Sequence, residues 1–183
     1  FIFVGRHNEG DKVILAALDT TVTPRVSAES EVNAEYSQGH LLTVREGVLM
    51  ATPFAMDQEK VVAGGTPLVE DILSISGAAV AVFSSSDSGM LVFQTGANTQ
   101  TDQLIFSADI ETGASTTVGE PGQVFHPFVS PDGQQALVEV RDSSNEGTDL
   151  WLVDLTTGLR TRFTFAAGDE NRPWWSRSGE NVY

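Results

Sequence analysis

The chain has 183 residues, 40% of them hydrophobic, which is enough for a buried core in one domain or a short array of repeats. Its 25 acidic and 10 basic residues give a formal net charge of −15, and this charge argues against nucleic-acid binding because it repels phosphate backbones. No apolar run approaches the roughly 18 residues that a membrane helix needs, so we expect no direct membrane insertion. The absence of cysteine excludes disulfides and thiolate chemistry.

The first 70 residues contain two degraded copies of a strand pattern. The first copy predicts strands at residues 1–5, 13–19 and 24–27, without an opening strand. The second copy predicts strands at residues 35–37, 40–45, 48–54 and 61–68. Because the chain starts with Phe1 and ends as a new strand begins, we expect it to be a piece of a longer protein.

The next two copies are clearer. The third predicts strands at residues 78–83, 89–94, 104–109 and 115–118, and the fourth at 125–129, 136–141, 148–155 and 160–165. A fifth copy opens with residues 172–176 and 181–183. Each full copy is therefore predicted to be a sheet of four short antiparallel strands.

Two kinds of turn mark the period of this pattern. Ser130-Pro131-Asp132-Gly133 has the residues that a type I turn favours. Related turns end at Gly89 and Gly179, at spacings of 133 − 89 = 44 and 179 − 133 = 46 residues. The second turn follows the third strand of each copy, where Asp109 and Asp154 lie 154 − 109 = 45 residues apart. We expect these aspartates, like Asp132, to accept backbone hydrogen bonds in their turns.

A period of about 40–50 residues with four short strands is typical of β-propeller blades. The predicted fold class is all-β, a propeller of four-stranded antiparallel blades with about four blades' worth of chain. The predicted blades are residues 1–30, 31–70, 76–119 and 124–166, with 171–183 opening a further blade. A β-sandwich is the main alternative, but it would not need two turn motifs at fixed offsets.

Three of these motifs resemble the WD-repeat-like propellers of the TolB type: the Ser-Pro-Asp-Gly turn, the Pro-Trp-Trp-Ser stretch ending at Ser176, and Asp-Leu-Trp-Leu-Val-Asp-Leu ending at Leu155. Residues 40–47 with Pro53-Phe54, and residues 161–165, look most like propellers attached to bacterial serine/threonine kinases of eukaryotic type. This resemblance implies a periplasmic or otherwise extracytoplasmic propeller that senses or binds. The chain has no Gly-rich loop and no His-Arg-Asp segment, so any kinase activity would lie outside it.

The sequence offers no catalytic residues, no metal site and no cofactor site. The histidines His7, His40 and His126 are far apart and hold different places in their repeats. None of the serines lies in a Gly-x-Ser-x-Gly elbow. The tryptophans Trp151, Trp174 and Trp175 point to packing between blades, and strand alternation should bury Trp174 and Trp175 against opposite neighbours.

The candidate binding residues are chosen by position. Loops that join the last strand of one blade to the first strand of the next surround one mouth of a propeller's channel, and such loops carry binding residues. Here they contain Glu120, Gln123, His126, Asp169, Glu170, Asn171 and Arg172.

These residues predict a noncatalytic module that binds a protein or a small-molecule ligand. The alternative is the gating propeller of a prolyl-oligopeptidase-like serine hydrolase whose catalytic domain lies elsewhere. Four blades are few for a closed ring, so we also predict that two chains pair as a homodimer to complete one.

Overall fold

The computed structural model describes residues 2–5, 12–16, 25–75, 80–96, 102–141, 147–166 and 168–183. All regular elements in these ranges are β-strands, which confirms the all-β prediction. The described residues contain no helix that is long and apolar enough to span a membrane. Contacts divide the chain into two compact units, Phe1–Ala81 and Val82–Tyr183.

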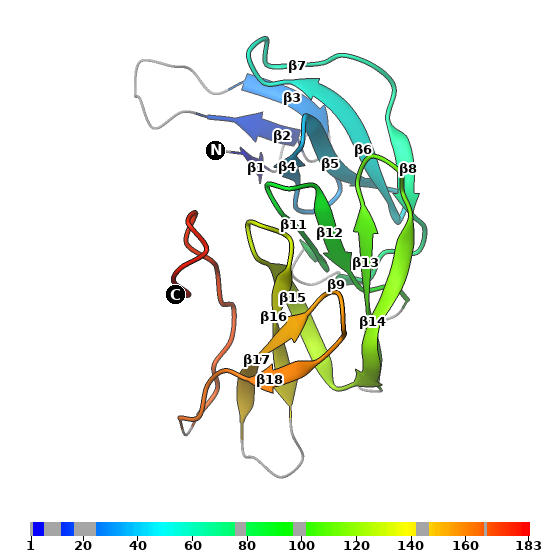
Figure 1. Ribbon diagram of the computed structural model, residues 1–183. Helices are drawn as coiled ribbons and strands as arrows, with labels where there is room; N and C mark the ends of the chain where they lie inside the picture. Colours follow the sequence, from blue (N-terminus) through cyan, green and yellow to red (C-terminus); the bar gives the residue numbers. More distant parts are fainter. Residues whose placement is uncertain are drawn as a thin grey trace. The chain divides into compact units, whose positions relative to one another are not determined.

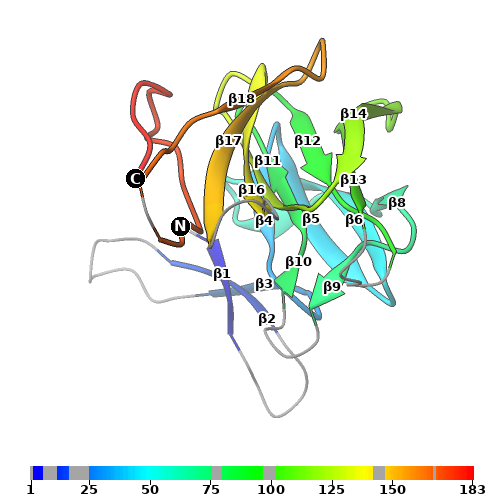
Figure 2. The same ribbon diagram turned by 90° about the horizontal axis from the view of Figure 1, so that it is seen from below.

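The first unit contains three antiparallel sheets (Figures 1 and 2). The first sheet has the order β1 (Ile2–Gly5), β2 (Lys12–Leu15), β3 (Arg25–Glu29). The second has the order β4 (Glu35–Ser37), β5 (His40–Arg45), β6 (Val48–Ala55), β7 (Lys60–Val61), with β8 (Thr66–Val69) also paired to β6. The third is the short pair β9 (Ser74–Ile75) and β10 (Val80–Ala81). The first two sheets share a buried cluster of Val13, Leu15, Leu41 and Phe54.

The single strand predicted at residues 61–68 is wrong, because the structure divides it into β7 and β8. Phe54 pairs with Val61, and Ala51 pairs with Thr66. Between these pairs β6 advances 54 − 51 = 3 residues while its partner advances 66 − 61 = 5. Two extra residues therefore loop out around Gly64 and Gly65, where the absence of side chains weakens a strand and permits a bulge.

The second unit contains two four-stranded antiparallel sheets (Figure 1). The first has the order β11 (Phe83–Ser85), β12 (Met90–Phe93), β13 (Gln103–Asp109), β14 (Ser115–Gly122). The second has the order β15 (Val124–Val129), β16 (Gln135–Arg141), β17 (Thr148–Asp154), β18 (Arg160–Arg162). One apolar core joins them, formed by Val92, Ile105, Val118, Val124, Val129, Ala136, Val138, Val153 and Leu155.

The first strand of the β11–β14 sheet begins later than the predicted range of 78–83. Val80 and Ala81 pair backward with Ile75 and Ser74 in the first unit, and β11 starts at Phe83. An apolar run shows that a segment is buried but not which neighbour it pairs with, so the prediction merged two strands into one.

The Ser-Pro-Asp-Gly stretch forms the predicted tight turn. The Gly133 amide donates to the Ser130 carbonyl at 2.9 Å, and Gly133 has a φ of 73°. The same bond joins Gly89 to Ser86 at 3.3 Å and Gly179 to Ser176 at 2.9 Å. The three turns thus repeat in structure as well as in sequence.

The prediction for the turn aspartates is also confirmed. Asp109 Oδ1 accepts from the amide and the hydroxyl of Thr112, each at 2.8 Å. Asp154 Oδ1 accepts from the Thr157 amide at 2.7 Å and its hydroxyl at 2.9 Å. These hydrogen bonds hold the pKa of both carboxyl groups below the ordinary value, because they stabilise the ionised form. Asp132 has a lowered pKa for the same reason, through Ser130 and Gln134.

These depressed pKa values predict a pH-dependent contribution to stability. A carboxylate whose pKa is lowered in the folded state stabilises it above the unfolded pKa of about 4, and this contribution disappears as the pH falls through the lower, folded pKa. We expect Asp109→Ala to cost about 1 kcal/mol of unfolding free energy at pH 7. The cost should shrink as the pH falls below about 4.

Urea titrations of both proteins at a series of pH values measure this cost. Asp102→Ala is the control, because Asp102 is exposed and accepts no hydrogen bond from the residues that the structure describes. A cost for Asp109→Ala that stays constant down to pH 2 would contradict the assignment.

The two adjacent tryptophans differ from the prediction in one respect. The Trp175 indole is half-buried and donates to the Phe128 carbonyl at 2.9 Å, but Trp174 is 66% exposed, so its predicted burial is wrong. Its segment pairs through the Trp175–Val182 bridge, and Trp175 is the residue whose side chain bonds β15. Trp151 packs against the core as expected.

Candidate functional site

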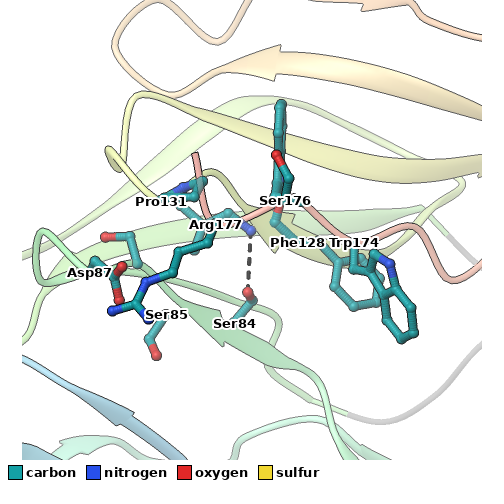
Figure 3. Close-up of a pocket in the computed structure, with 11 residues that line it drawn as sticks. Ser84, Ser85, Asp87, Phe128, Pro131, Trp174, Ser176 and Arg177 are labelled. Atoms are coloured by element: carbon teal, nitrogen blue, oxygen red, sulfur yellow. Dashed lines mark hydrogen bonds between the residues drawn. The ribbon is translucent and has the colours of Figure 1, made fainter. Parts of the chain in front are cut away.

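A groove of about 400 Å³ runs along the first strands of successive sheets in the second unit (Figure 3). We call it the first-strand groove. It is lined by Ser84, Ser85, Ser86, Asp87, Phe128, Val129, Pro131, Trp174, Trp175, Ser176 and Arg177.

The residues of the groove occupy equivalent places in three repeats. The turns begin at Ser86, Ser130 and Ser176. Two residues before these serines the chain has Ser84, Phe128 and Trp174, respectively. The residue directly after the turn serine is an aspartate, a proline and an arginine. The turn serine and turn glycine are the same in all three repeats. The fold therefore fixes the turn, while the adjacent positions carry unlike side chains into one groove.

Side chains join the first strands across the groove. Ser84 Oγ accepts a hydrogen bond from the Val129 amide at 3.2 Å (Figure 3). Trp175 Nε1 donates to the Phe128 carbonyl at 2.9 Å. Below them, the Ser88 hydroxyl donates to the Asp132 carbonyl of the next turn at 2.9 Å. These bonds give the groove a fixed floor, which a binding site on a rigid scaffold needs.

The two ends of the groove differ in chemistry. Asp87 and Arg177 lie at one end with their charged groups turned toward each other, and Phe128 and Trp174 lie at the other (Figure 3). Trp174 exposes most of its indole, whose flat face can stack on an aromatic or cationic group. The arrangement can hold an elongated ligand by stacking at one end and by charge-assisted hydrogen bonds at the other.

The seven residues predicted from the inter-strand loops do not line this groove. The structure brings two of them, His126 and Arg172, onto one carboxylate that the sequence did not single out. Glu139 of β16 is 6% exposed; its Oε2 lies 2.8 Å from His126 Nδ1, and its Oε1 accepts from the Arg172 amide at 2.8 Å. The carboxylate that His126 meets belongs to its own sheet, because β15 pairs with β16.

The backbone at this carboxylate is unusual in both repeats. His126 and Arg172 have φ angles of 47° and 52°, and each is followed by a buried proline, Pro127 or Pro173. A left-handed conformation costs a non-glycine residue energy, and proline normally directs the preceding residue to extended geometry. The two bonds to Glu139 offset this cost.

The other predicted residues have separate places. Asp169 accepts from the Thr148 amide at 2.9 Å, and Glu170 accepts from the Thr164 hydroxyl at 3.0 Å. The Glu120 carbonyl accepts from Arg160, and the Gln123 carbonyl accepts from the Arg141 amide at 3.1 Å. Asn171 is exposed. A binding role for these residues stays a prediction, and the Asp169 carboxylate already bonds the backbone.

Arg162 and Asp149 form a charge pair in the same unit, and the Phe165 ring lies against the guanidinium. Arg162 Nη2 donates to Asp149 Oδ1 at 2.8 Å, and its guanidinium lies 5.1 Å from the centre of the Phe165 ring. Asp149 exposes 3% of its side chain. Within the described ranges, no group of three or more His, Asp or Glu side chains is placed to hold a metal ion.

A signal for the groove was present in the sequence. In a repeat protein, positions that carry the same residue in every repeat maintain the fold. Neighbouring positions whose residue differs between repeats are available for binding. The residues beside the turn serine differ in this way. For Glu139 the sequence carried no comparable signal, because a single glutamate in a strand gives no indication of burial.

Solved structures share this fold over nearly the whole chain. The chain aligns with TolB from Acinetobacter baumannii at a TM-score of 0.70 and 14% identity, covering 99% of this chain and 45% of that one. It aligns with oligogalacturonate lyase in complex with manganese at a TM-score of 0.63 and 16% identity, covering 100% of this chain and 54% of that one. For Kuenenia stuttgartiensis hydrazine synthase the values are 0.57, 12%, 100% and 57%.

The chain thus spans about half the length of these three proteins. No protein-family model and no curated protein sequence matches it. At identities this low the likeness concerns the fold alone. Together with the repeated four-stranded sheets, it identifies the fold as a β-propeller resembling that of TolB.

Proposed function

We propose that the chain is a noncatalytic binding module and that its first-strand groove holds the ligand or partner. The first strands of successive propeller blades line the central channel, which is a common place for binding. The observation that carries the proposal is the groove itself: equivalent positions of three repeats supply unlike polar, charged and aromatic side chains to one concave surface.

The remaining polar groups support a role in binding rather than turnover. The serines of the groove are engaged in structural bonds, as Ser84 is with the Val129 amide. His126 is not among the residues that line the groove, so this histidine is not placed to act as a base for a groove serine. The net charge of −15 favours a cationic or neutral partner by long-range attraction.

Fluorine NMR tests this proposal, because the chain has three tryptophans in distinct settings. In protein labelled with 5-fluorotryptophan, Trp174 and Trp175 report on the groove and Trp151 reports on the core. We expect members of a fragment library of aromatic amines and amides to shift the two groove signals and leave the core signal unchanged. Trp174→Ala should weaken such binding about tenfold, since an exposed aromatic anchor carries much of the binding energy.

Phe165→Ala is the matched control. Phe165 is 74% exposed but does not line the groove, so this variant should bind as the unchanged protein does. A library in which no fragment shifts the groove signals at millimolar concentration would refute the proposal. So would an equal loss of affinity in the Phe165 variant.

The wider assignments remain predictions. An extracytoplasmic location, attachment to a kinase and the pairing of two chains are suggested by the sequence resemblance and the repeat number alone. The gating role in a serine hydrolase requires an adjoining catalytic domain, and the full gene would reveal it.

A further inference from the structure

A second cavity lies wholly within the first unit, and none of its lining residues belongs to the first-strand groove. It has a volume of about 290 Å³ and lies between β3 and the β4–β8 sheet. We call it the β3–β6 cavity. It is lined by Ala28, Glu29, Thr43, Arg45, Met50, Thr52, Val61, Ala63, Gly64 and Gly65.

The floor of the cavity is one face of the sheet. Thr43 pairs with Met50, and Thr52 is two residues further along β6, so the three side chains share that face. Thr43 is 4% exposed, and its hydroxyl has no hydrogen-bond partner among the residues that the structure describes. The Thr43 hydroxyl is therefore available to pair with a polar group or a water inside the cavity.

The roof is the backbone loop between β7 and β8. A Cβ atom on Gly65 would lie 2.5 Å from Thr52 Oγ1 and 3.5 Å from the Met50 methyl carbon. Only a glycine lets the main chain approach the floor this closely. The loop between β7 and β8 thus covers the cavity, whereas an unbroken strand there would have paired with β6 along its whole length.

Lys12, Glu29 and Arg45 form a charge cluster, of which Glu29 and Arg45 line the rim of the cavity. Glu29 Oε1 accepts from Lys12 Nζ at 2.8 Å, and Glu29 Oε2 accepts from Arg45 Nη2 at 3.2 Å. Two cations therefore face one carboxylate. The hydrogen bond and charge of Lys12, followed by the charge of Arg45, lower the pKa of Glu29, so the carboxylate is ionised at neutral pH. Because the Glu29 carboxylate is shared between Lys12 and Arg45, the exposed Arg45 guanidinium keeps N–H donors for a further acceptor at the rim.

We propose that the β3–β6 cavity binds a small carboxylate with an apolar body. Its carboxylate meets the Arg45 guanidinium at the rim, where charge and hydrogen-bond geometry match. Its body lies against Met50, Ala28 and Val61, and the volume is at the lower end of the range for small-molecule pockets. A polar atom of the ligand or an accompanying water pairs with the Thr43 hydroxyl.

Methionine NMR tests this binding with 3-phenylpropionate as the probe. The chain has three methionines, of which Met50 lines the cavity, Met56 follows β6 and Met90 lies in the other unit. In protein with ¹³C-labelled methionine methyl groups, we expect the acid to shift Met50 saturably while Met90 stays in place. The neutral analogue 3-phenylpropanamide should bind about tenfold more weakly, because it lacks the charge that Arg45 recognises.

Two variants separate the parts of the site. Arg45→Gln should lower the affinity for the acid about tenfold and leave the affinity for the amide unchanged. Arg45→Lys should retain most of the affinity for the acid. Thr43→Val keeps the shape of the floor and should weaken both probes. Arg141→Gln removes an exposed cation of the other unit and is the matched control.

The unchanged protein alone can overturn the proposal. If the Met50 methyl signal does not shift at millimolar 3-phenylpropionate, the cavity does not bind the acid and holds water only. If the acid and the amide shift Met50 equally, or if Met90 moves with it, the charged rim does not recognise the ligand. Each of these results rejects the site, and none bears on the first-strand groove.

Discussion

Replacing Gly158 by alanine is expected to destabilise the second unit by about 2–4 kcal/mol. Gly158 has a φ of 72°, a conformation that costs an L-residue free energy. A Cβ atom there would lie 2.7 Å from the Gly119 amide nitrogen and 2.8 Å from its Cα. Both obstacles are backbone atoms of the neighbouring sheet, so the contact cannot be relieved by turning a side chain.

Chemical denaturation followed by the fluorescence of the tryptophans, all of which lie in the second unit, measures this loss. Gly96→Ala is the control, because Gly96 has a φ of 87° in the same unit but no atom within 4 Å of the added Cβ. It should lose only about 1 kcal/mol, the cost of the backbone conformation. Equal losses for the two variants would show that the approach of Gly158 to Gly119 is not tight.

Replacing Glu139 by alanine should cost about 2–4 kcal/mol, since it removes a buried carboxyl group from two hydrogen bonds at once. The variant loses the bonds to His126 Nδ1 and to the Arg172 amide, while both residues keep their left-handed backbone. Glu139→Gln retains one acceptor oxygen and should lose about half as much, because only one of its two terminal side-chain atoms can still accept a hydrogen bond.

A double-mutant cycle with His126→Ala isolates one of the two bonds. We expect a coupling free energy of about 1 kcal/mol or more between Glu139 and His126. Glu111→Ala, at an exposed carboxylate, serves as the control and should change stability by less than about 0.5 kcal/mol. A coupling of zero would mean that Glu139 acts on Arg172 alone.

The repeat and its turns could be predicted from sequence because their causes are local. Ser130 and Gly133 determine a turn by backbone geometry and short-range hydrogen bonds, whatever surrounds them. Asp109 and Asp154 act on the three residues that follow them. Strands β4 and β5 were predicted to the residue, since the short turn between them fixes where the first strand ends and the second begins.

The parts that failed depend on neighbours distant in sequence. Whether Trp174 is buried is decided by the sheet that faces it, and alternation along its own strand carries no information about that sheet. The split of the strand at residues 61–68 depends on how far β6 extends beside it. Glu139 is recognisable only after β15 and the segment at Arg172 meet over β16.

Ser84 and Trp175 each serve two purposes, because both line the groove and both supply the bond that joins one first strand to the next. Affinity and blade spacing are therefore not independent properties of this protein. A substitution at either residue that adapts the groove to a new ligand therefore also changes the strength of a hydrogen bond between two first strands. In the opposite direction, an occupant that bonds the Trp175 indole N–H competes with the Phe128 carbonyl, so occupancy of the groove weakens the bond between these two strands.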